Sequence, residues 1–221
     1  MTTYLITGSN RGIGLEYCRQ LTNRGDEVIG VCRSASKGLE SLGIRIESKV
    51  DIRSETAITN LKASLNTKKI DVLINNAAIA ENNSLESLNS ESLKNQFEIN
   101  AIRPLILTKI MLGNLKEGSK VILMSSRMGS IEDNKSGGSY GYRMSKVALC
   151  MAGKSLSVDL KPLGISVALL HPGLVKTRMT GFTSNGISPE KAVKGLIERI
   201  DLLNLENSGS FWHSNGQELP W

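Results

Sequence analysis

The chain has 221 residues, of which 40% are hydrophobic and 22% are charged, and its net charge is +6. A chain of this length and composition can bury one substantial core, so we expect a single domain over residues 1–221. No apolar run has the length of a membrane span and the 27 Lys and Arg residues are dispersed, which disfavours a membrane protein and a nucleic-acid-binding protein.

Apolar runs of strand length alternate with helical patterns along the chain. The apolar runs are nearly continuous, which indicates strands buried on both faces, as in a parallel sheet. We expect these strands over 3–7, 27–32, 44–50, 71–75, 120–125 and 165–171, with a short seventh strand near 210–213. Helical patterns cover 13–24, the residues after Ser54, 91–112, 141–160 and 188–203. This alternation predicts a doubly wound α/β fold, with a parallel sheet of about seven strands.

A glycine-rich turn joins the first predicted strand to the first predicted helix. Gly8 permits a tight turn, while Gly12 and Gly14 let the backbone approach a pyrophosphate and let the helix pack on the sheet. The helix N-terminus then offers free N–H groups to the phosphates. Three glycines alone are weak evidence for such a site, but their position between a strand and a helix predicts a dinucleotide-binding site. The predicted contacts in this turn are Gly8, Asn10, Arg11, Gly12, Ile13 and Gly14.

The end of the second predicted strand distinguishes NAD from NADP. An acidic residue there would bind the ribose 2′-hydroxyl, but the chain has Arg33 and Ser34 instead. Arg33 and Arg11 can bind a 2′-phosphate, although each can equally be an exposed turn residue. We therefore predict that NADPH is preferred over NADH. After the third strand, Asp51 and Ile52 are candidates for the adenine side, and Asp51 can equally cap the following helix.

The segment YGYRMSK, residues 140–146, holds two tyrosines and a lysine. Tyr142 and Lys146 would share one helix face, whereas Tyr140 would not. Such a pair is common on exposed helices, where it has no chemical role. An ammonium beside a phenol also favours the phenolate, which suits proton transfer. The phosphate turn and the position of Ser126, at the end of the fifth strand, favour this catalytic interpretation.

Several motifs together resemble the short-chain dehydrogenase/reductase family over essentially the whole chain. They occur in the family's order: the glycine turn, INNAA at 74–78, Asn100, SSRMG at 125–129, Tyr142-x-x-x-Lys146 and HPGLVKT at 171–177. The chain is most similar to the compact carbonyl-reductase-like branch named for sniffer and C-factor. That likeness lies in YGYRMSK, LHPGLVKT and NGQELPW.

The resemblance implies a catalytic tetrad of Asn100, Ser126, Tyr142 and Lys146. Ser126 is chosen over Ser125 because the family's serine precedes a two-residue spacer and a glycine. The tyrosine would protonate a carbonyl oxygen, and the serine would hydrogen-bond the same oxygen. The lysine would acidify the tyrosine and bind the nicotinamide ribose, and the asparagine would orient the lysine through water.

The resemblance also implies further cofactor contacts. These are Asn75 and Ala77 near the adenosine ribose, and Pro172, Gly173, Val175 and Thr177 near the nicotinamide. The family's Asn-Asn-Ala-Gly departs in its last residue, which is Ala78 here. A methyl group is tolerable there if the φ of Ala78 is negative, and it strains the loop otherwise.

We expect an NADPH-dependent carbonyl reductase acting on an aldehyde, ketone, quinone or dicarbonyl compound. The alternative is a cofactor-sensing or signalling protein of the C-factor type, without significant turnover. The short segment 178–187, where a substrate lid would lie, predicts an open site with Met128, Met179 and Phe182 as apolar walls. The polar insert 131–139 predicts a mobile loop beside that site.

The remaining expectations concern partners and location. The family resemblance implies a homodimer or homotetramer through the helices 91–112 and 141–160. A strand that starts at residue 3 leaves no room for a cleaved leader, so we expect a cytoplasmic protein. Its three cysteines, Cys18, Cys32 and Cys150, should be reduced and partly buried. No metal site is expected, because the cysteines lack metal-ligand spacing and the two histidines are far apart.

Overall fold

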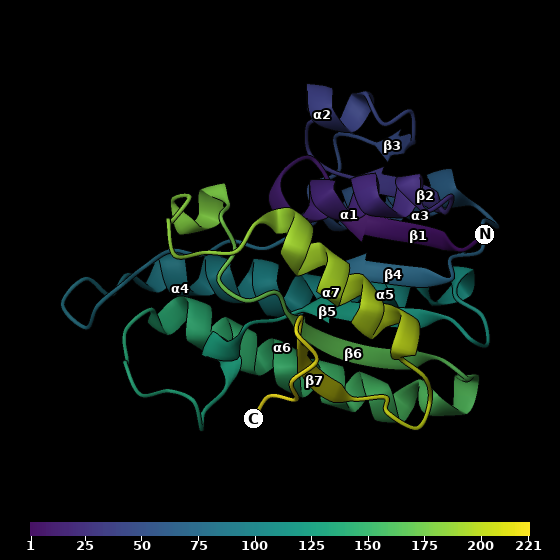
Figure 1. Cartoon of the computed structure of the whole chain (residues 1–221). Helices are drawn as coiled ribbons and strands as arrows, with labels where there is room; N and C mark the ends of the chain where they lie inside the picture. The colour runs from purple at the N-terminus through teal and green to yellow at the C-terminus, as the bar shows by residue number, and fades with distance from the viewer.

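A sheet of seven strands forms the centre of the molecule, and the computed structural model describes all 221 residues (Figure 1). The strands are β1 (Thr3–Thr7), β2 (Glu27–Val31), β3 (Arg45–Glu47), β4 (Val72–Asn75), β5 (Lys120–Met124), β6 (Ser166–His171) and β7 (Ser210–His213). Their order is β3-β2-β1-β4-β5-β6-β7, and every neighbouring pair is parallel. The order changes direction between β1 and β4, where open parallel sheets bind ligands. The predicted doubly wound fold is confirmed.

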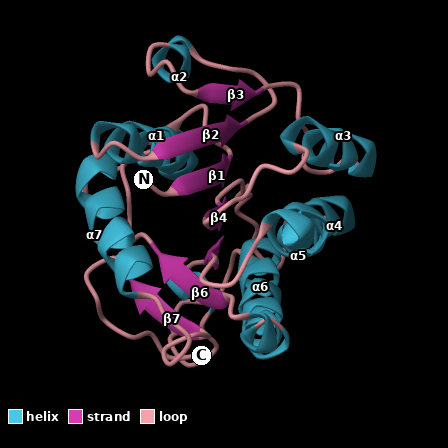
Figure 2. Cartoon of the chain, turned by 90° about the vertical axis from the view of Figure 1, so that its right-hand side faces the viewer, coloured by secondary structure: helices cyan, strands magenta, loops and turns pink.

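Helices cover both faces of this sheet. They are α1 (Gly12–Asn23), α2 (Lys37–Glu40), α3 (Glu55–Leu65), α4 (Ser90–Phe97), α5 (Arg103–Met111), α6 (Tyr140–Asp159) and α7 (Pro189–Leu202). Figure 2 shows α1 and α7 on one side of the sheet and α3, α4, α5 and α6 on the other. None of the helices combines the length and apolarity needed to cross a membrane.

Neighbouring residues of each central strand pack on opposite faces of the sheet. In β1, Leu5 belongs to the buried apolar cluster that includes α3, α5 and α6, whereas Tyr4 and Ile6 belong to the cluster that includes α1 and α7. Because both faces are buried, apolar residues are favoured at every strand position. This explains the nearly continuous apolar runs in the sequence.

The helix expected over 91–112 is interrupted. α4 ends at Phe97, a π-helical turn spans Glu98–Ile102, and α5 begins at Arg103. Pro104 has no N–H group to donate to the carbonyl four residues earlier, which belongs to Asn100, so the regular ladder cannot continue there. Short π-helical segments inside helices occur frequently at functional sites. Here the segment holds Asn100, a member of the predicted tetrad.

Replacing a side chain at the sheet centre should destabilise the fold strongly. Leu73 in β4 is fully buried, so Leu73→Ala is expected to lower the free energy of unfolding by about 2–5 kcal/mol. Leu85 is 66% exposed, so the control Leu85→Ala should change it by less than about 0.5 kcal/mol. Urea unfolding measures both variants. Equal effects would contradict the central position of β4.

Candidate active site

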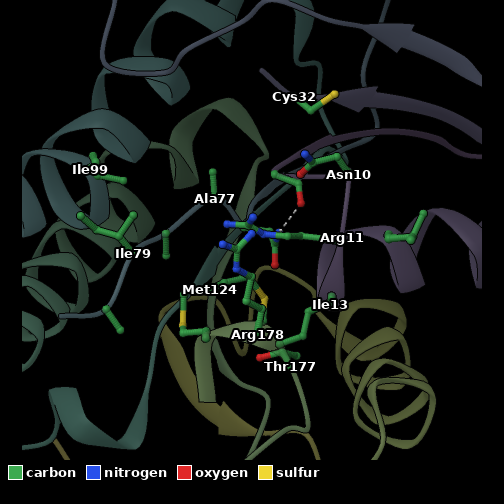
Figure 3. A pocket seen from close by; sticks show the side chains of 18 of the residues that line it. Asn10, Arg11, Ile13, Cys32, Ala77, Ile79, Ile99, Met124, Thr177 and Arg178 are labelled. Carbon is green, nitrogen blue, oxygen red and sulfur yellow. Dashed lines mark hydrogen bonds between the residues drawn. The ribbon is translucent and has the colours of Figure 1, made fainter. Parts of the chain in front are cut away.

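A cavity of 1070 Å³ lies where five of the parallel strands end. Its walls include the first residues after β1, β2, β4, β5 and β6, namely Gly8, Cys32, Asn76, Ser125 and Pro172. Figure 3 shows Asn10 and Cys32 at one side of this cavity, and Ile79 and Ile99 at another. This edge is where open α/β sheets bind their ligands. The volume is at the upper end of small-molecule sites, which are about 300–1,000 Å³.

The glycine turn forms one end of the cavity and has no space for side chains. Gly8 has a φ of +68°, and a Cβ atom built on it would lie 3.0 Å from the Cα atom of Ala77. A Cβ atom on Gly14 would lie 2.2 Å from the Gly8 carbonyl oxygen. Arg11, the N-cap residue of α1, makes no capping hydrogen bond with its side chain. The uncapped helix N-terminus therefore fits an anionic group such as a pyrophosphate.

Arg11 and Arg33 line the cavity as exposed cations. Neither takes part in an ion pair, whereas Arg53, close to them on the wall, is paired with Asp51. Two unpaired guanidinium groups are suited to bind a phosphate group through charge-assisted hydrogen bonds. Ser34 lies outside the cavity wall, but its carbonyl accepts a hydrogen bond from Asn10 Nδ2 at 2.9 Å.

The structure decides one of the two roles that the sequence left open for Asp51, the capping of α3. Ser54 caps α3, because its side chain accepts the N–H group of Ala57. Asp51 instead pairs with Arg53 at 2.6 Å, and that hydrogen bond holds the pKa of the Asp51 carboxyl below its ordinary value. Asp51 and Ile52 both line the cavity, and their contact with the adenine side stays a prediction.

The loop after β4 differs from the expectation at Asn75. This side chain is 4% exposed and lies outside the cavity, where its Nδ2 donates to Thr108 Oγ1 at 3.2 Å. Asn76 lines the cavity instead, and its Nδ2 donates to the Thr7 carbonyl at 2.9 Å. Successive residues of an extended chain point in opposite directions, so only one of the two asparagines can lie at the cavity.

The other predicted cofactor residues divide between the cavity and its surroundings. Ala77, Pro172 and Thr177 line the cavity, whereas Gly173 and Val175 do not. The φ of Ala78 is not positive, so the methyl group in place of the family's glycine causes no backbone strain.

Tyr142 and Lys146 lie on the same side of α6, and both line the cavity. Lys146 Nζ is 5.6 Å from the centroid of the Tyr142 ring. Lys146 is only 2% exposed, and its Nζ donates to the Met124 carbonyl at the end of β5, at 2.7 Å. Burial lowers the pKa of Lys146 to about 8. At pH 7 the site therefore holds a buried cation against the tyrosine ring.

The pKa of Tyr142 differs from the expectation. Burial raises the pKa of Tyr142, and its hydrogen bond with Ser126 lowers it by a smaller amount. The ammonium of Lys146 lies over the ring and donates to the Met124 carbonyl, and in this structure it does not offset the effect of burial on the pKa of the phenol. Tyr142 is consequently protonated at neutral pH, which is the state that can donate a proton.

Ser126 is the serine beside Tyr142. Its Oγ accepts the N–H group of Met128 at 3.1 Å and forms a hydrogen bond with the tyrosine. Ser125 lines the cavity, and its Oγ lies 3.2 Å from Cys150 Sγ. The choice of Ser126 over Ser125 as the catalytic serine stays a prediction.

The glycine that follows Ser126 explains the spacing of the motif. A Cβ atom on Gly129 would lie 2.9 Å from the Cβ atom of Lys146. Only glycine therefore lets the turn after Ser126 pack directly on α6. This contact brings the serine next to the tyrosine and the lysine.

Asn100 is fully buried and joins the π-helical turn to two other segments. Its Oδ1 accepts the N–H group of Ile79, and its Nδ2 donates to the Ile79 carbonyl and to Ser145 Oγ, at 2.9–3.0 Å. Its side chain makes no direct hydrogen bond with Lys146. Since Ser145 precedes Lys146 on α6, Asn100 acts on the lysine by holding the helix that carries it.

Two expectations concerned the surroundings of the site: its apolar walls and the mobility of the polar segment 131–139. Met179 and Phe182 line the cavity, but Met128 does not. The polar segment 131–139 is held by Arg143, which donates to Ser136 Oγ at 2.8 Å and to the carbonyls of Gly137 and Gly138 at 3.3 and 3.2 Å. The sequence analysis did not name Asn76, Met124 or Arg178 as cavity residues, although Asn76 belongs to the INNAA motif and the other two each lie next to a motif residue.

Residues 2–187 match the family described as short chain dehydrogenase, and the chain belongs to this family of oxidoreductases. The 1-hydroxy-2-glutathionyl-2-methyl-3-butene dehydrogenase of Rhodococcus sp. (strain AD45) is 40% identical over 226 residues, which cover 100% of each chain. The C-signal protein of Myxococcus xanthus is 44% identical over 158 residues, which cover 70% of this chain and 95% of that protein.

Two solved structures are similar to this chain over its whole length. The carbonyl reductase Sniffer of D. melanogaster has a TM-score of 0.91 and 32% identity, with 100% of each chain covered. An NADPH-bound carbonyl reductase from chicken fatty liver has a TM-score of 0.90 and 27% identity, and covers 100% of this chain and 99% of its own. The predicted sniffer and C-factor-like branch is confirmed.

The buried lysine should destabilise the folded chain at neutral pH. Because the pKa of Lys146 falls from 10.5 to about 8 on folding, the unfolded chain binds more protons between these values. The unfavourable contribution is full below pH 8 and disappears as the pH rises toward 10.5. Lys146→Met is therefore expected to raise the free energy of unfolding at pH 7 by about 1–3 kcal/mol. At pH 9.5 the same substitution should raise it by a smaller amount.

Urea unfolding at both pH values measures this difference. The control is Lys154→Met, on the exposed part of the same helix, which should change the free energy of unfolding by less than about 0.5 kcal/mol. A loss of stability in Lys146→Met at pH 7 would contradict the account.

Proposed function

We propose that the protein is an NADPH-dependent carbonyl reductase in which Tyr142 donates the proton. The observation that carries this proposal is the meeting of Tyr142 and the buried Lys146 in the cavity that begins at the glycine turn, with Ser126 beside the tyrosine. The NADPH-bound carbonyl reductase from chicken fatty liver, which shares this fold, supports the choice of cofactor and reaction.

Different residues of the cavity would bind different parts of the cofactor. The glycine turn and the N-terminus of α1 would hold the pyrophosphate, and Arg11 and Arg33 would hold the 2′-phosphate. Lys146 would bind the nicotinamide ribose, with Thr177 and Pro172 beyond it. The bound cofactor supplies a hydride to the carbonyl carbon.

The chain's own residues control the proton. Tyr142 OH donates its proton to the carbonyl oxygen, and the raised pKa keeps this proton on the phenol until then. Ser126 hydrogen-bonds the same oxygen and stabilises negative charge as it develops. The ammonium of Lys146 stabilises the phenolate left behind, since opposite charges attract strongly in a site from which water is excluded.

The substrate side of the cavity is apolar and open. Met179 and Phe182 form part of its wall, and both are exposed. Aldehydes, ketones, quinones and dicarbonyl compounds fit such a site. The name of the Rhodococcus relative adds one further class for testing, an alcohol that carries a glutathionyl group.

Removing the Tyr142 hydroxyl should abolish turnover without abolishing cofactor binding. NADPH absorbance at 340 nm is followed with a panel of these carbonyl compounds, and with NADP⁺ and a glutathionyl alcohol. Tyr142→Phe is expected to lower kcat by at least about 10²-fold, the usual contribution of a general acid. Tyr140→Phe, on the same helix, is the control and should retain activity.

Each other outcome has a definite meaning. Equal activity in wild type and Tyr142→Phe would refute Tyr142 as the acid. A folded wild-type protein that binds NADPH but turns over no compound would favour the sensing alternative, to which the likeness to the C-signal protein also points.

We also propose that two copies associate through α4, α5 and α6, in the cytoplasm. Met144, Met151 and Val158 are spaced by seven residues along α6, so they lie on one face, and all three are exposed. Phe97 and Leu105 add exposed apolar surface on α4 and α5. The three cysteines are free and buried, which fits a reducing compartment.

A charge on this apolar face should separate the copies. Met151 is 68% exposed, and Met151→Arg is expected to shift the mass measured by light scattering from dimer to monomer. Leu85→Arg, on another exposed apolar residue, is the control. A monomeric wild-type protein would contradict the proposed association.

A further inference from the structure

The cavity wall contains a positively charged side chain, Arg178, to which we have assigned no role so far. Arg178 lines the cavity from the segment after β6, and it forms no ion pair and no side-chain hydrogen bond within the chain. Figure 3 shows the side chains of Arg11 and Arg178 entering the middle of the pocket from different sides. An exposed guanidinium without an acidic partner, in a cavity that already has unpaired arginines, is suited to bind an anion.

The turn that carries Arg178 is firmly built. Thr177 N donates to Thr180 Oγ1 at 3.2 Å, and Thr180 Oγ1 donates to the Val175 carbonyl at 2.6 Å. At its base, the N–H group of Lys176 donates to the Ile187 carbonyl at 2.9 Å. Because the backbone is fixed in this way, little backbone conformational entropy is lost when the arginine binds a ligand.

The position of the turn indicates which part of the cofactor Arg178 would contact. A Cβ atom built on Gly12, the first residue of α1, would lie 3.5 Å from Thr177 Cγ2. The turn therefore packs on the helix N-terminus that suits a pyrophosphate. The 2′-phosphate side is marked by Arg33, which follows a different strand, β2.

We propose that Arg178 binds the pyrophosphate of the cofactor, from the turn that packs on the first residue of α1. This rests on the proposed function, because it requires a dinucleotide in the cavity. Arg178 is also the first residue of the segment 178–187, the expected substrate lid. The cofactor would then be held between α1 and the lid, and the lid would be fixed before a substrate arrives.

Two cofactors and two arginines separate this role from recognition of the 2′-phosphate. Dissociation constants for NADPH and NADH are measured by calorimetry for wild type, Arg178→Ala and Arg33→Ala. Both cofactors have a pyrophosphate, so Arg178→Ala is expected to weaken both by about ten- to hundredfold. Arg33→Ala should weaken NADPH alone. Since both side chains are exposed, the variants should keep the wild-type unfolding temperature.

Lys176→Ala is the matched control for charge, because Lys176 lines the same side of the cavity. Lys176→Ala should change the affinity for NADPH and for NADH by less than about threefold, since an exposed charge that makes no direct contact contributes little at physiological salt. An equal loss in Lys176→Ala and Arg178→Ala would overturn the specific contact. An Arg178→Ala protein that binds both cofactors like wild type, or loses only NADPH, would also overturn it. A wild-type protein that binds neither would overturn the proposed function as well.

Discussion

The hydrogen bond from the buried ammonium of Lys146 to the Met124 carbonyl is the interaction on which the site depends. It joins α6, which carries the tyrosine, to the end of the strand that leads to Ser126. The helix can come this close because Gly129 and Gly153 have no side chains; a Cβ atom on Gly153 would lie 2.8 Å from Leu123 Cδ1. A buried cation opposes folding, so the surrounding packing has to outweigh it.

The rest of the chain fixes α6 in place. Asn100, in the π-helical turn, ties the loop after β4 to Ser145, and Arg143 ties the polar segment 131–139 to the same helix. The proposed proton donor, Tyr142, therefore lies on a helix held at several points along its length. A donor held in this way is positioned before the substrate binds, which is the main requirement for efficient proton transfer.

The sequence predicted most of the fold and the shared helix face of Tyr142 and Lys146, because these depend on local patterns. Buried strands leave continuous apolar runs, and Tyr142 and Lys146 share a face through helical spacing alone. The predictions failed where the outcome depends on three-dimensional contacts. The direction of the Asn75 side chain depends on Thr108, and the pKa of Tyr142 depends on burial and on Ser126. Arg178 is hidden because an isolated arginine has no pattern.

The most direct test of the account is the pKa of Lys146 itself. NMR of the protein labelled with ¹³C at the lysine side chains gives one titration curve for each lysine, and the Lys146 resonance is identified by its absence in Lys146→Met. The account predicts that this resonance titrates near pH 8, well below the ordinary lysine value of 10.5. A Lys146 resonance that titrates at the ordinary value would contradict the claim that the site is built around a buried ammonium.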